Sequence, residues 1–350
     1  MKKRWLCLSL AATLALSAGL LGACTPQEQD PDDDNNNGTS TEYVLPTWQT
    51  VPESWDSENR ASVHDPSIFY DEASETYYAF GTHYAVASSK DLMAWEQVAD
   101  DEDFSVLYGD AVYKYQGQYE WPAALEDTLD LVSPTAEGGG IATTTWAPDV
   151  EYYNGKYYMY YSLTKYFGAS QSAIGRVESD SVLGPYTNNT LIVNSVGDSS
   201  VHPNCIDPEL FYDEEGKLWM VYGSASDGIY IKELHNSGDN WGLPIDDGEH
   251  AYGTKLWSGT KNQEGPFIFY NEETNYYYLM VSYGDLNKSY NMRVARSENP
   301  DGPYVDITGA DVATATGDNG GNKIAGNYIM GDDADGYAAL NNPVSYTHLT

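Results

Sequence analysis

The chain has 350 residues, and its 53 acidic and 17 basic side chains give a formal net charge of −36 at pH 7. Such a charge excludes nucleic acid as a partner, because binding it demands a basic surface, and it disfavours anionic substrates. A neutral polymer is compatible with it. The 31 tyrosines and nine tryptophans suit flat contacts with sugar rings, although β-sheet propensity explains most of the tyrosines better.

A secretion signal opens the sequence. Three basic residues at positions 2–4 precede an apolar run over residues 5–21, which is the pattern of a signal peptide. The run closes with the sequence LGAC, ending at Cys24, which resembles the lipobox of bacterial lipoproteins and implies cleavage before Cys24 and lipidation of that residue. The alternatives are a plain signal peptide or a membrane-spanning helix with an incidental cysteine. We therefore expect residues 1–23 to be a lipoprotein signal peptide.

The segment that follows the signal is polar and acidic. Residues 24–44 hold almost no apolar side chains, so we expect the lipidated Cys24 to be followed by a disordered acidic tether. Of the three cysteines, Cys7 leaves with the signal and Cys24 would be lipidated, so Cys205 remains alone and no internal disulfide can form. Residues 45–342 are expected to form the folded domain, and residues 343–350 to be an extraneous end.

Four stretches of the folded part resemble one another. Each has an acidic residue near a proline, then a short turn, then a Tyr-rich alternating run. They cover residues 63–80, 146–162, 206–224 and 264–284. Alternating runs that flank a tight turn predict a β-hairpin in each copy. Further short strand-like runs follow each hairpin, so the repeating unit has about four strands.

Repeats of about four strands predict a β-propeller in which each repeat forms one blade. The acidic residues that we place at the heads of the copies are Asp65, Asp149, Asp207 and Glu264. In a propeller the first strand of each blade lines the central channel, so these residues are expected to meet at one mouth of the channel. An insertion over residues 99–145 separates the first two copies and is expected to contain a short helix.

A fifth copy is incomplete. The sequence from Asn322 to Leu340 looks like the start of another blade, but the chain ends ten residues later. The sequence therefore predicts an all-β fold, a five-bladed β-propeller whose fifth blade is truncated in this chain.

Five motifs in order resemble family 43 of the glycoside hydrolases. They are VHDPSI, WAPDV, HPNCIDPELFYDEEGKLWMVYGS, EGPFIFY and NMRVARSENPDGPY. The resemblance covers about residues 60–340, and within the family it is greatest to the endo-α-1,5-L-arabinanases, which are five-bladed propellers.

The resemblance implies three catalytic carboxylates. Asp65 corresponds to the general base, Glu264 to the general acid, and Asp207 to a third carboxylate that orients the acid and raises its pKa. Hydrolysis with inversion places the base and the acid about 6.5–9.5 Å apart. A lone Asp-Pro is usually a turn or a cap, but three acids that match three family positions favour catalysis. For Asp149 we expect a structural role, because the catalytic set is complete without it.

The remaining candidate residues concern binding. Trp146 matches a family position that stacks on a sugar, with a core tryptophan as the alternative, and Asn204 is a candidate hydrogen-bonding partner of a sugar hydroxyl. Cys205 is interpreted as a small buried residue rather than a nucleophile. The six histidines show no zinc-binding spacing, so we expect no metal site and no cofactor for the chemistry. The resemblance implies a channel calcium with a fifth-blade histidine in a Gly-His-Asn segment, and His348 does not align with it.

The resemblance thus predicts cleavage of internal α-1,5-L-arabinofuranosyl linkages in arabinan, a side chain of pectin. The signal predicts export to the bacterial envelope, at the outer membrane or cell surface, of a monomer that touches the membrane only through its lipid anchor. One alternative is an exo-acting α-L-arabinofuranosidase or β-xylosidase of the same family. Another is a glycan-binding propeller lipoprotein without catalysis.

Overall fold

The computed structural model describes the repeated part of the chain. The described residues are 61–100, 103–110, 112–115, 119–132, 144–165, 171–198, 200–246, 251–259, 263–285, 289–316 and 320–326. The predicted signal peptide, Cys24, the tether and residues 327–350 lie outside them. Within these ranges, no helix has both the length and the apolar character needed to cross a membrane.

Four antiparallel sheets of four strands each follow one another along the chain. The first contains β1 (Ser67–Asp71), β2 (Thr76–Phe80), β3 (Val86–Ser89) and β4 (Trp95–Ala99). The second contains β7 (Thr144–Tyr153), β8 (Lys156–Thr164), β9 (Ser172–Ser179) and β10 (Thr187–Asn194). The third contains β11 (Glu209–Tyr212), β12 (Leu218–Tyr222), β13 (Gly228–Leu234) and β14 (Thr254–Ser258). The fourth contains β15 (Gln263–Asn271), β16 (Tyr276–Tyr283), β17 (Asn291–Ser297) and β18 (Asn322–Gly326).

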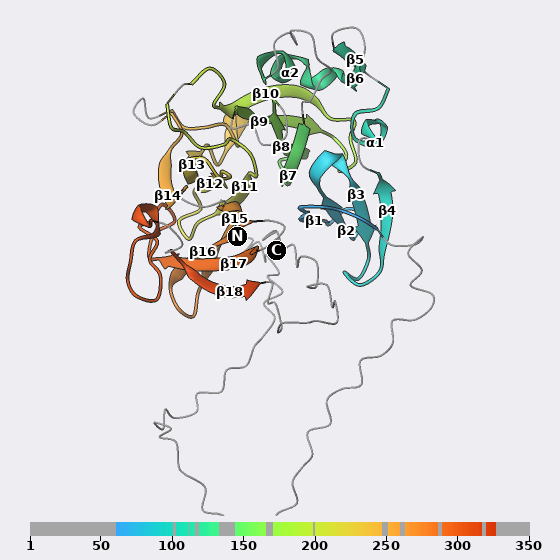
Figure 1. The fold of residues 1–350 in the computed structure, drawn as a ribbon. Coiled ribbons are helices and arrows are strands. Elements are labelled where there is room, and N and C mark those ends of the chain that lie inside the picture. The colour runs from blue at the N-terminus through green and yellow to red at the C-terminus, as the bar shows by residue number, and fades with distance from the viewer. Residues whose placement is uncertain are drawn as a thin grey trace, which may run out of the picture. The chain divides into compact units, whose positions relative to one another are not determined.

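These sheets are the blades of a propeller. Strand order within each sheet follows the chain, and the first strand of each blade contacts the first strand of the next, β1 with β7, β7 with β11, and β11 with β15. Figure 1 shows these four strands nearest the middle and β4, β10, β14 and β18 on the outside. The four predicted hairpins are therefore confirmed, and each forms the inner half of a blade.

The insertion between the first two blades is partly helical. It contains α1 (Phe104–Tyr108), the hairpin β5 (Val112–Tyr115) and β6 (Tyr119–Pro122), the 3₁₀ turn η3 (Ala123–Leu125) and α2 (Glu126–Val132). The other 3₁₀ turns are η2 (Thr82–Tyr84), η4 (Gly238–Asn240) and η5 (Val312–Thr314). The sequence predicted a short helix here but missed α1 and the hairpin.

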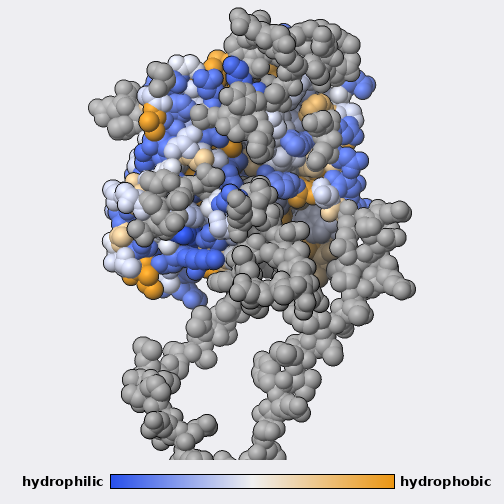
Figure 2. Space-filling view, in the orientation of Figure 1, coloured by the Kyte–Doolittle hydropathy of each residue, from blue (hydrophilic) through white to orange (hydrophobic). Residues whose placement is uncertain are grey.

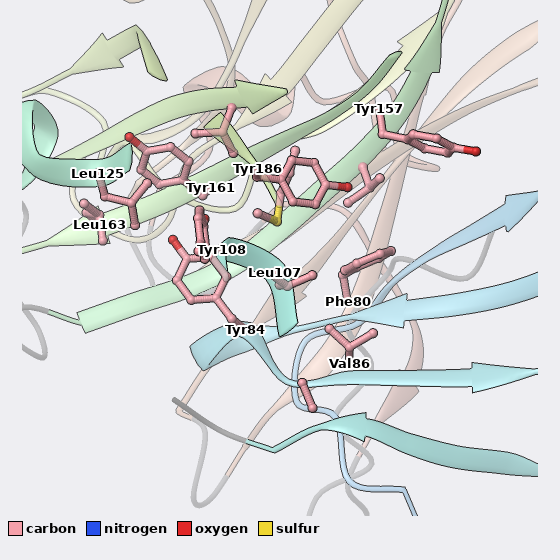
Figure 3. Close-up of a cluster of buried hydrophobic side chains, with 14 of the residues drawn as sticks. Phe80, Tyr84, Val86, Leu107, Tyr108, Leu125, Tyr157, Tyr161, Leu163 and Tyr186 are labelled. Carbon is pink, nitrogen blue, oxygen red and sulfur yellow. The ribbon is translucent and has the colours of Figure 1, made fainter. Parts of the chain in front are cut away.

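Apolar side chains fill the spaces between neighbouring blades. Between the first two blades, tyrosines and leucines from α1, η3, β8 and the β2–β3 connection form one cluster (Figure 3), in which Tyr84, Leu107 and Tyr161 are at most 1% exposed. Two further clusters join the second blade to the third and the third to the fourth. On the face that Figure 2 shows, the visible described residues are mostly hydrophilic, with separate hydrophobic spots. The fold is therefore stabilised by burial between blades.

The segment from Asn322 does not begin a fifth blade, as the sequence predicted, but completes the fourth. Asn322–Gly326 forms β18, which pairs with β17 as the outermost strand of the fourth blade. In the second blade the outer strand follows directly after Tyr186, whereas residues 305–321 separate Tyr304 from β18. This long connection hid the last strand of the fourth blade in the sequence. The rest of the expected fifth blade, residues 327–342, lies outside the described residues.

Candidate active site

A three-residue segment that ends in proline stands directly before the inner strand in the first and third blades and near its start in the second and fourth. The segments are His64–Pro66, Trp146–Pro148, Ile206–Pro208 and Glu264–Pro266. The second and fourth contain a β-bulge, because pairing with the next strand shifts between Trp146 and Asp149 and between Glu264 and Phe267. Bulges redirect side chains and are common next to active sites. The proline therefore marks the head of every blade.

The residue before the proline has an unusual backbone conformation in three blades. Asp65, Asp207 and Gly265 have φ angles of 55°, 57° and 55°. A left-handed conformation is costly for residues other than glycine, although aspartate tolerates it better than most. We infer that the turn at the blade head, rather than the acid itself, imposes this conformation, because glycine adopts it at the matching place in the fourth blade.

The alignment of blades corrects the place that the sequence suggested for Asp149. Asp65 and Asp207 precede their prolines, whereas Asp149 follows Pro148, so its counterparts are Ser67 and Glu209. Strand pairing agrees, because Ser67, Asp149 and Glu209 each begin the regular pairing of their blade's first hairpin after the turn. Asp149 is therefore not a blade head.

Asp149 ties three blades together. It is 6% exposed, and its Oδ1 accepts hydrogen bonds from Ser67 Oγ (2.7 Å) and the Val150 amide (3.0 Å). Its Oδ2 accepts one from the Leu210 amide (2.9 Å). These donors lie on β1, β7 and β11, so the expected structural role of Asp149 is confirmed.

Asp65 lies buried at the head of the first blade, with 3% of its surface exposed. Its Oδ2 accepts a hydrogen bond from Thr82 Oγ1 at 2.5 Å, and its Oδ1 lies 2.5 Å from Nδ1 of His64. Thr82 belongs to the turn after β2 and His64 directly precedes the aspartate, so both partners come from the same blade. These contacts hold the carboxylate in one orientation.

Asp207 joins the heads of the third and fourth blades. Its Oδ2 accepts a hydrogen bond from the amide of Gly265 (3.0 Å), the residue after Glu264, and its own amide donates to Ser162 Oγ (3.2 Å). Burial raises the pKa of Asp207 well above its ordinary value, and the charges of Glu264 and Asp65 raise it further. Asp207 is thus a buried carboxyl that holds its proton more tightly than usual.

Glu264 is half-buried and has two hydroxyl partners. Tyr290 donates to Oε1 at 2.6 Å, and Ser224 donates to Oε2 at 3.1 Å. Burial raises the pKa of Glu264, the hydrogen bonds from Tyr290 and Ser224 lower it, and the Asp65 charge raises it again, so that the net direction is upward. The structure therefore brings Asp65, Asp207 and Glu264 into one cluster of interacting carboxyl groups.

The two candidate binding residues lie on the blades beside this cluster. Trp146 is half-buried, its indole N–H donates to Thr164 Oγ1 (2.8 Å), and its ring centroid is 6.1 Å from that of His83. Asn204 is 8% exposed and its backbone forms a bridge with Ser224. Asn204 Oδ1 is buried and has no hydrogen-bond partner among the described residues, and a buried acceptor of that kind suits a ligand hydroxyl.

Sequence reasoning missed the hydroxyl groups that contact the catalytic candidates. Thr82 and Ser224 donate to the carboxylates of Asp65 and Glu264, and each stands two residues after the second strand of its hairpin. Ser162, near the end of β8, accepts from the backbone amide of Asp207. A recurring small hydroxyl at this place in each repeat was a signal that could have been used. Tyr290 offers no such signal, because it is one of 31 tyrosines and is distant in the chain from Glu264, which it contacts only in the folded protein.

Cys205 is a buried free cysteine. Cys205 is fully buried, its amide donates to Ser172 Oγ (2.6 Å), and burial raises the pKa of its thiol to about 12. The interpretation of Cys205 as a buried structural residue is therefore confirmed.

Within the described ranges, no group of three or more His, Cys, Asp or Glu side chains is arranged to hold a metal ion. His348 lies outside those ranges.

A second group of carboxyls lies near Asp149, and Glu209 is its most buried member. Glu209 is 4% exposed, and its Oε2 has no hydrogen-bond partner in the described part of the chain. Burial raises its pKa well above the ordinary value of 4.5, and the charges of Asp149 and Glu151 add to the effect. Glu151 has a raised pKa for the same two reasons, burial and the Asp149 charge.

We expect Glu209→Gln to stabilise the protein at alkaline pH. Above pH 4.5 the unfolded chain releases this proton while the native state keeps it, so stability falls as pH rises toward the raised native pKa. Glutamine removes this loss. A tenfold change in a protonation constant is worth about 1.4 kcal/mol, so the gain at pH 8 should be at least about 1 kcal/mol. Urea unfolding at pH 5 and pH 8 measures it.

The difference between Glu209→Gln and the unmodified protein should shrink toward pH 5. Glu273→Gln, at an exposed turn, is the matched control and should leave stability unchanged at both pH values. Equal stability of Glu209→Gln and the unmodified protein at pH 8 would contradict the raised pKa that burial gives this carboxyl.

Carboxyl groups of different proton affinity that face one another are what glycoside hydrolases use to cut a glycosidic bond. The propeller and this cluster together are typical of that class. The model of the family "Glycosyl hydrolases family 43" matches residues 124–340. The chain belongs to this family, which confirms the family predicted from the motifs.

Relatives of known name agree with this assignment. An extracellular endo-α-(1→5)-L-arabinanase of Thermotoga petrophila is 39% identical over 296 residues, which cover 78% of this chain and 58% of the relative. Extracellular endo-α-(1→5)-L-arabinanase 2 of Bacillus subtilis is 39% identical over 274 residues, with 74% and 53% covered. The crystal structure of endo-1,5-α-L-arabinanase from Thermotoga petrophila superposes with a TM-score of 0.65, at 39% identity over 78% of this chain and 61% of that one. The chain thus spans between half and two thirds of the length of these relatives.

Proposed function

We propose that the protein is an inverting endo-α-1,5-L-arabinanase. The observation that carries the proposal is the cluster of Asp65, Asp207 and Glu264, in which Glu264 is half-buried, has a raised pKa and lies beside a fully buried carboxyl. Membership of family 43 and the similarity to endo-arabinanases over most of this chain support the choice of substrate.

The proposed reaction divides proton transfer between two carboxyl groups. Asp65, as the carboxylate, takes a proton from a water molecule whose oxygen attacks the anomeric carbon of the arabinofuranosyl unit. Glu264 gives its proton to the departing glycosidic oxygen as that carbon–oxygen bond breaks. A raised pKa suits Glu264 to this part, because an acid must hold its proton near neutral pH.

In the proposed reaction, Asp207 positions Glu264 and favours its protonated form. Its contact with the Gly265 amide holds the fourth blade head in place, and a negative charge on Asp207 would favour the protonated form of Glu264. Trp146 and Asn204 are proposed to contact the sugar, Trp146 with its ring face and Asn204 with its unpartnered Oδ1. In keeping with its family, we propose a five-bladed propeller whose fifth blade involves residues after Gly326.

Incubation of the protein with linear α-1,5-arabinan tests the proposal. We expect a mixture of arabino-oligosaccharides in the first minutes, followed by shorter products, and the released anomer should be inverted when observed by ¹H NMR. Arabinose as the sole early product would indicate exo action instead. A folded sample that binds arabinan without releasing any sugar would favour the glycan-binding alternative and contradict the proposal.

We also propose that the protein is exported and held on the bacterial envelope by lipid on Cys24. The LGAC sequence and the relatives named as extracellular support this proposal. The mass of the mature N-terminal peptide checks it, because cleavage before Cys24 with three acyl chains gives a mass that a plain signal cleavage cannot.

A further inference from the structure

Tyr290 makes a short contact with the proposed acid. The residue is fully buried and directly precedes β17, and its hydroxyl donates to Glu264 Oε1 at 2.6 Å. Oε2 of Glu264 accepts its own hydrogen bond from Ser224, which follows β12 in the neighbouring blade. The two carboxylate oxygens are therefore held from two different blades, and Tyr290 holds one of them from within the protein core.

The groups that face Glu264 act on its proton in opposite directions. Burial and the negative charge of Asp65 favour the protonated form, whereas Tyr290, Ser224 and the nearby His64 favour the ionised form. Asp207 is a further carboxyl neighbour, coupled to Glu264 by charge. A hydrogen bond to a carboxylate is about twice as strong as one to a neutral group. The Tyr290 contact therefore gains strength when Glu264 loses its proton.

We propose that Tyr290 is a positioning residue for the proposed hydrolysis, because its hydroxyl fixes the rotation of the Glu264 carboxyl group through Oε1 and leaves Oε2 to deliver the proton to the glycosidic oxygen. The inference rests on the proposed function. As the proton moves from Oε2 to the departing oxygen, negative charge spreads to Oε1, where the Tyr290 hydroxyl already donates. The contact thus stabilises the transition state more than the ground state.

The variant Tyr290→Phe tests this role. It removes one oxygen and keeps the ring that fills the core. Loss of a hydrogen bond to a charged group should lower kcat on linear arabinan about tenfold and move the alkaline limb of the kcat profile up by about one pH unit. KM should change little, because Tyr290 is buried beneath the carboxyl group. Damage to packing alone would lower kcat at every pH without moving the limb.

Tyr304→Phe is the matched control. Tyr304 is fully buried in the same blade, and its hydroxyl donates to the carbonyl of Pro300 at 3.0 Å. We expect its pH profile to coincide with that of the unmodified protein. A limb that stays in place in Tyr290→Phe, moves downward, or moves equally in Tyr304→Phe would overturn the proposal.

A readout without turnover separates this inference from the proposed function. In protein labelled with ¹³C at glutamate carboxyl groups, Glu264→Gln identifies the Glu264 signal, and its titration midpoint should rise by about one pH unit in Tyr290→Phe. An inactive unmodified protein would contradict the proposed function, while the midpoint still decides whether Tyr290 controls this proton. If Tyr290→Phe does not fold, the unmodified protein supplies the test: the chemical shift of Tyr290 Cζ is expected to change with pH at the Glu264 midpoint. A Tyr290 Cζ shift that stays constant over that pH range would overturn the proposal.

Discussion

Replacing Glu264 by glutamine is expected to lower kcat on linear arabinan by about 10³-fold, within the range for loss of a general acid. The amide is nearly isosteric and can still accept from Tyr290 or Ser224, but it has no proton of suitable acidity for the departing oxygen. Affinity for arabinan should stay within a few-fold, because the shape of the site is kept. Steady-state kinetics and calorimetric binding measure the two quantities separately.

A chemical control sharpens this experiment. An aryl arabinofuranoside with a good leaving group needs little protonation, so Glu264→Gln should cut it far better than it cuts arabinan. Glu298→Gln changes an exposed glutamate of the same blade and should leave both activities unchanged. If Glu264→Gln retains full activity on arabinan, the acid has been assigned to the wrong residue.

Replacing Asp149 by alanine is expected to destabilise the protein by about 3–5 kcal/mol, because three donors lose their shared acceptor and each buried group left unpaired costs about 1–3 kcal/mol. The donors are the Ser67 hydroxyl and the amides of Val150 and Leu210. The hydroxyl can turn to another partner, but the amides cannot. The free energy of unfolding in urea at pH 7 measures this loss.

Asp91→Ala is the matched control for Asp149→Ala. Oδ1 of Asp91 also accepts from one serine hydroxyl, that of Ser89, and from two amides, those of Met93 and Ala94. Asp91 is exposed, so water replaces the lost acceptor and the loss of stability should be much smaller. Similar losses in the two variants would show that the hydrogen bonds of Asp149 do not depend on burial between blades.

Much of the fold could be predicted because its signals are local. Alternation in the four Tyr-rich runs reports strands, the turns between them report hairpins, and both depend on residues that are neighbours in the chain. The proline at each blade head was visible for the same reason. The motifs around these prolines also contained Asp65, Asp207 and Glu264, which the fold brings together.

Other features depend on which blade lies beside which. Asp149 looked like a blade head because it stands next to a proline, yet it follows Pro148 where Asp65 and Asp207 precede theirs. Asp149 therefore stands two residues beyond the place that Asp65 and Asp207 occupy in their blades. Its donors on β1 and β11 belong to other blades, so no local pattern could reveal its role. The strand Asn322–Gly326 was misplaced because a long connection separates it from its partner.

The repeating hairpins, the family and the carboxylates at the blade heads could be predicted from the sequence alone, because each depends on short motifs of neighbouring residues. The contacts of those carboxylates could not, because they depend on the packing of strands that are distant in the chain. Thr82 and Tyr290 reach Asp65 and Glu264 from other parts of the same blade, and Ser224 reaches Glu264 from the neighbouring blade. Burial and neighbouring charges set proton affinity, and both depend on distances in space that the order of residues does not contain.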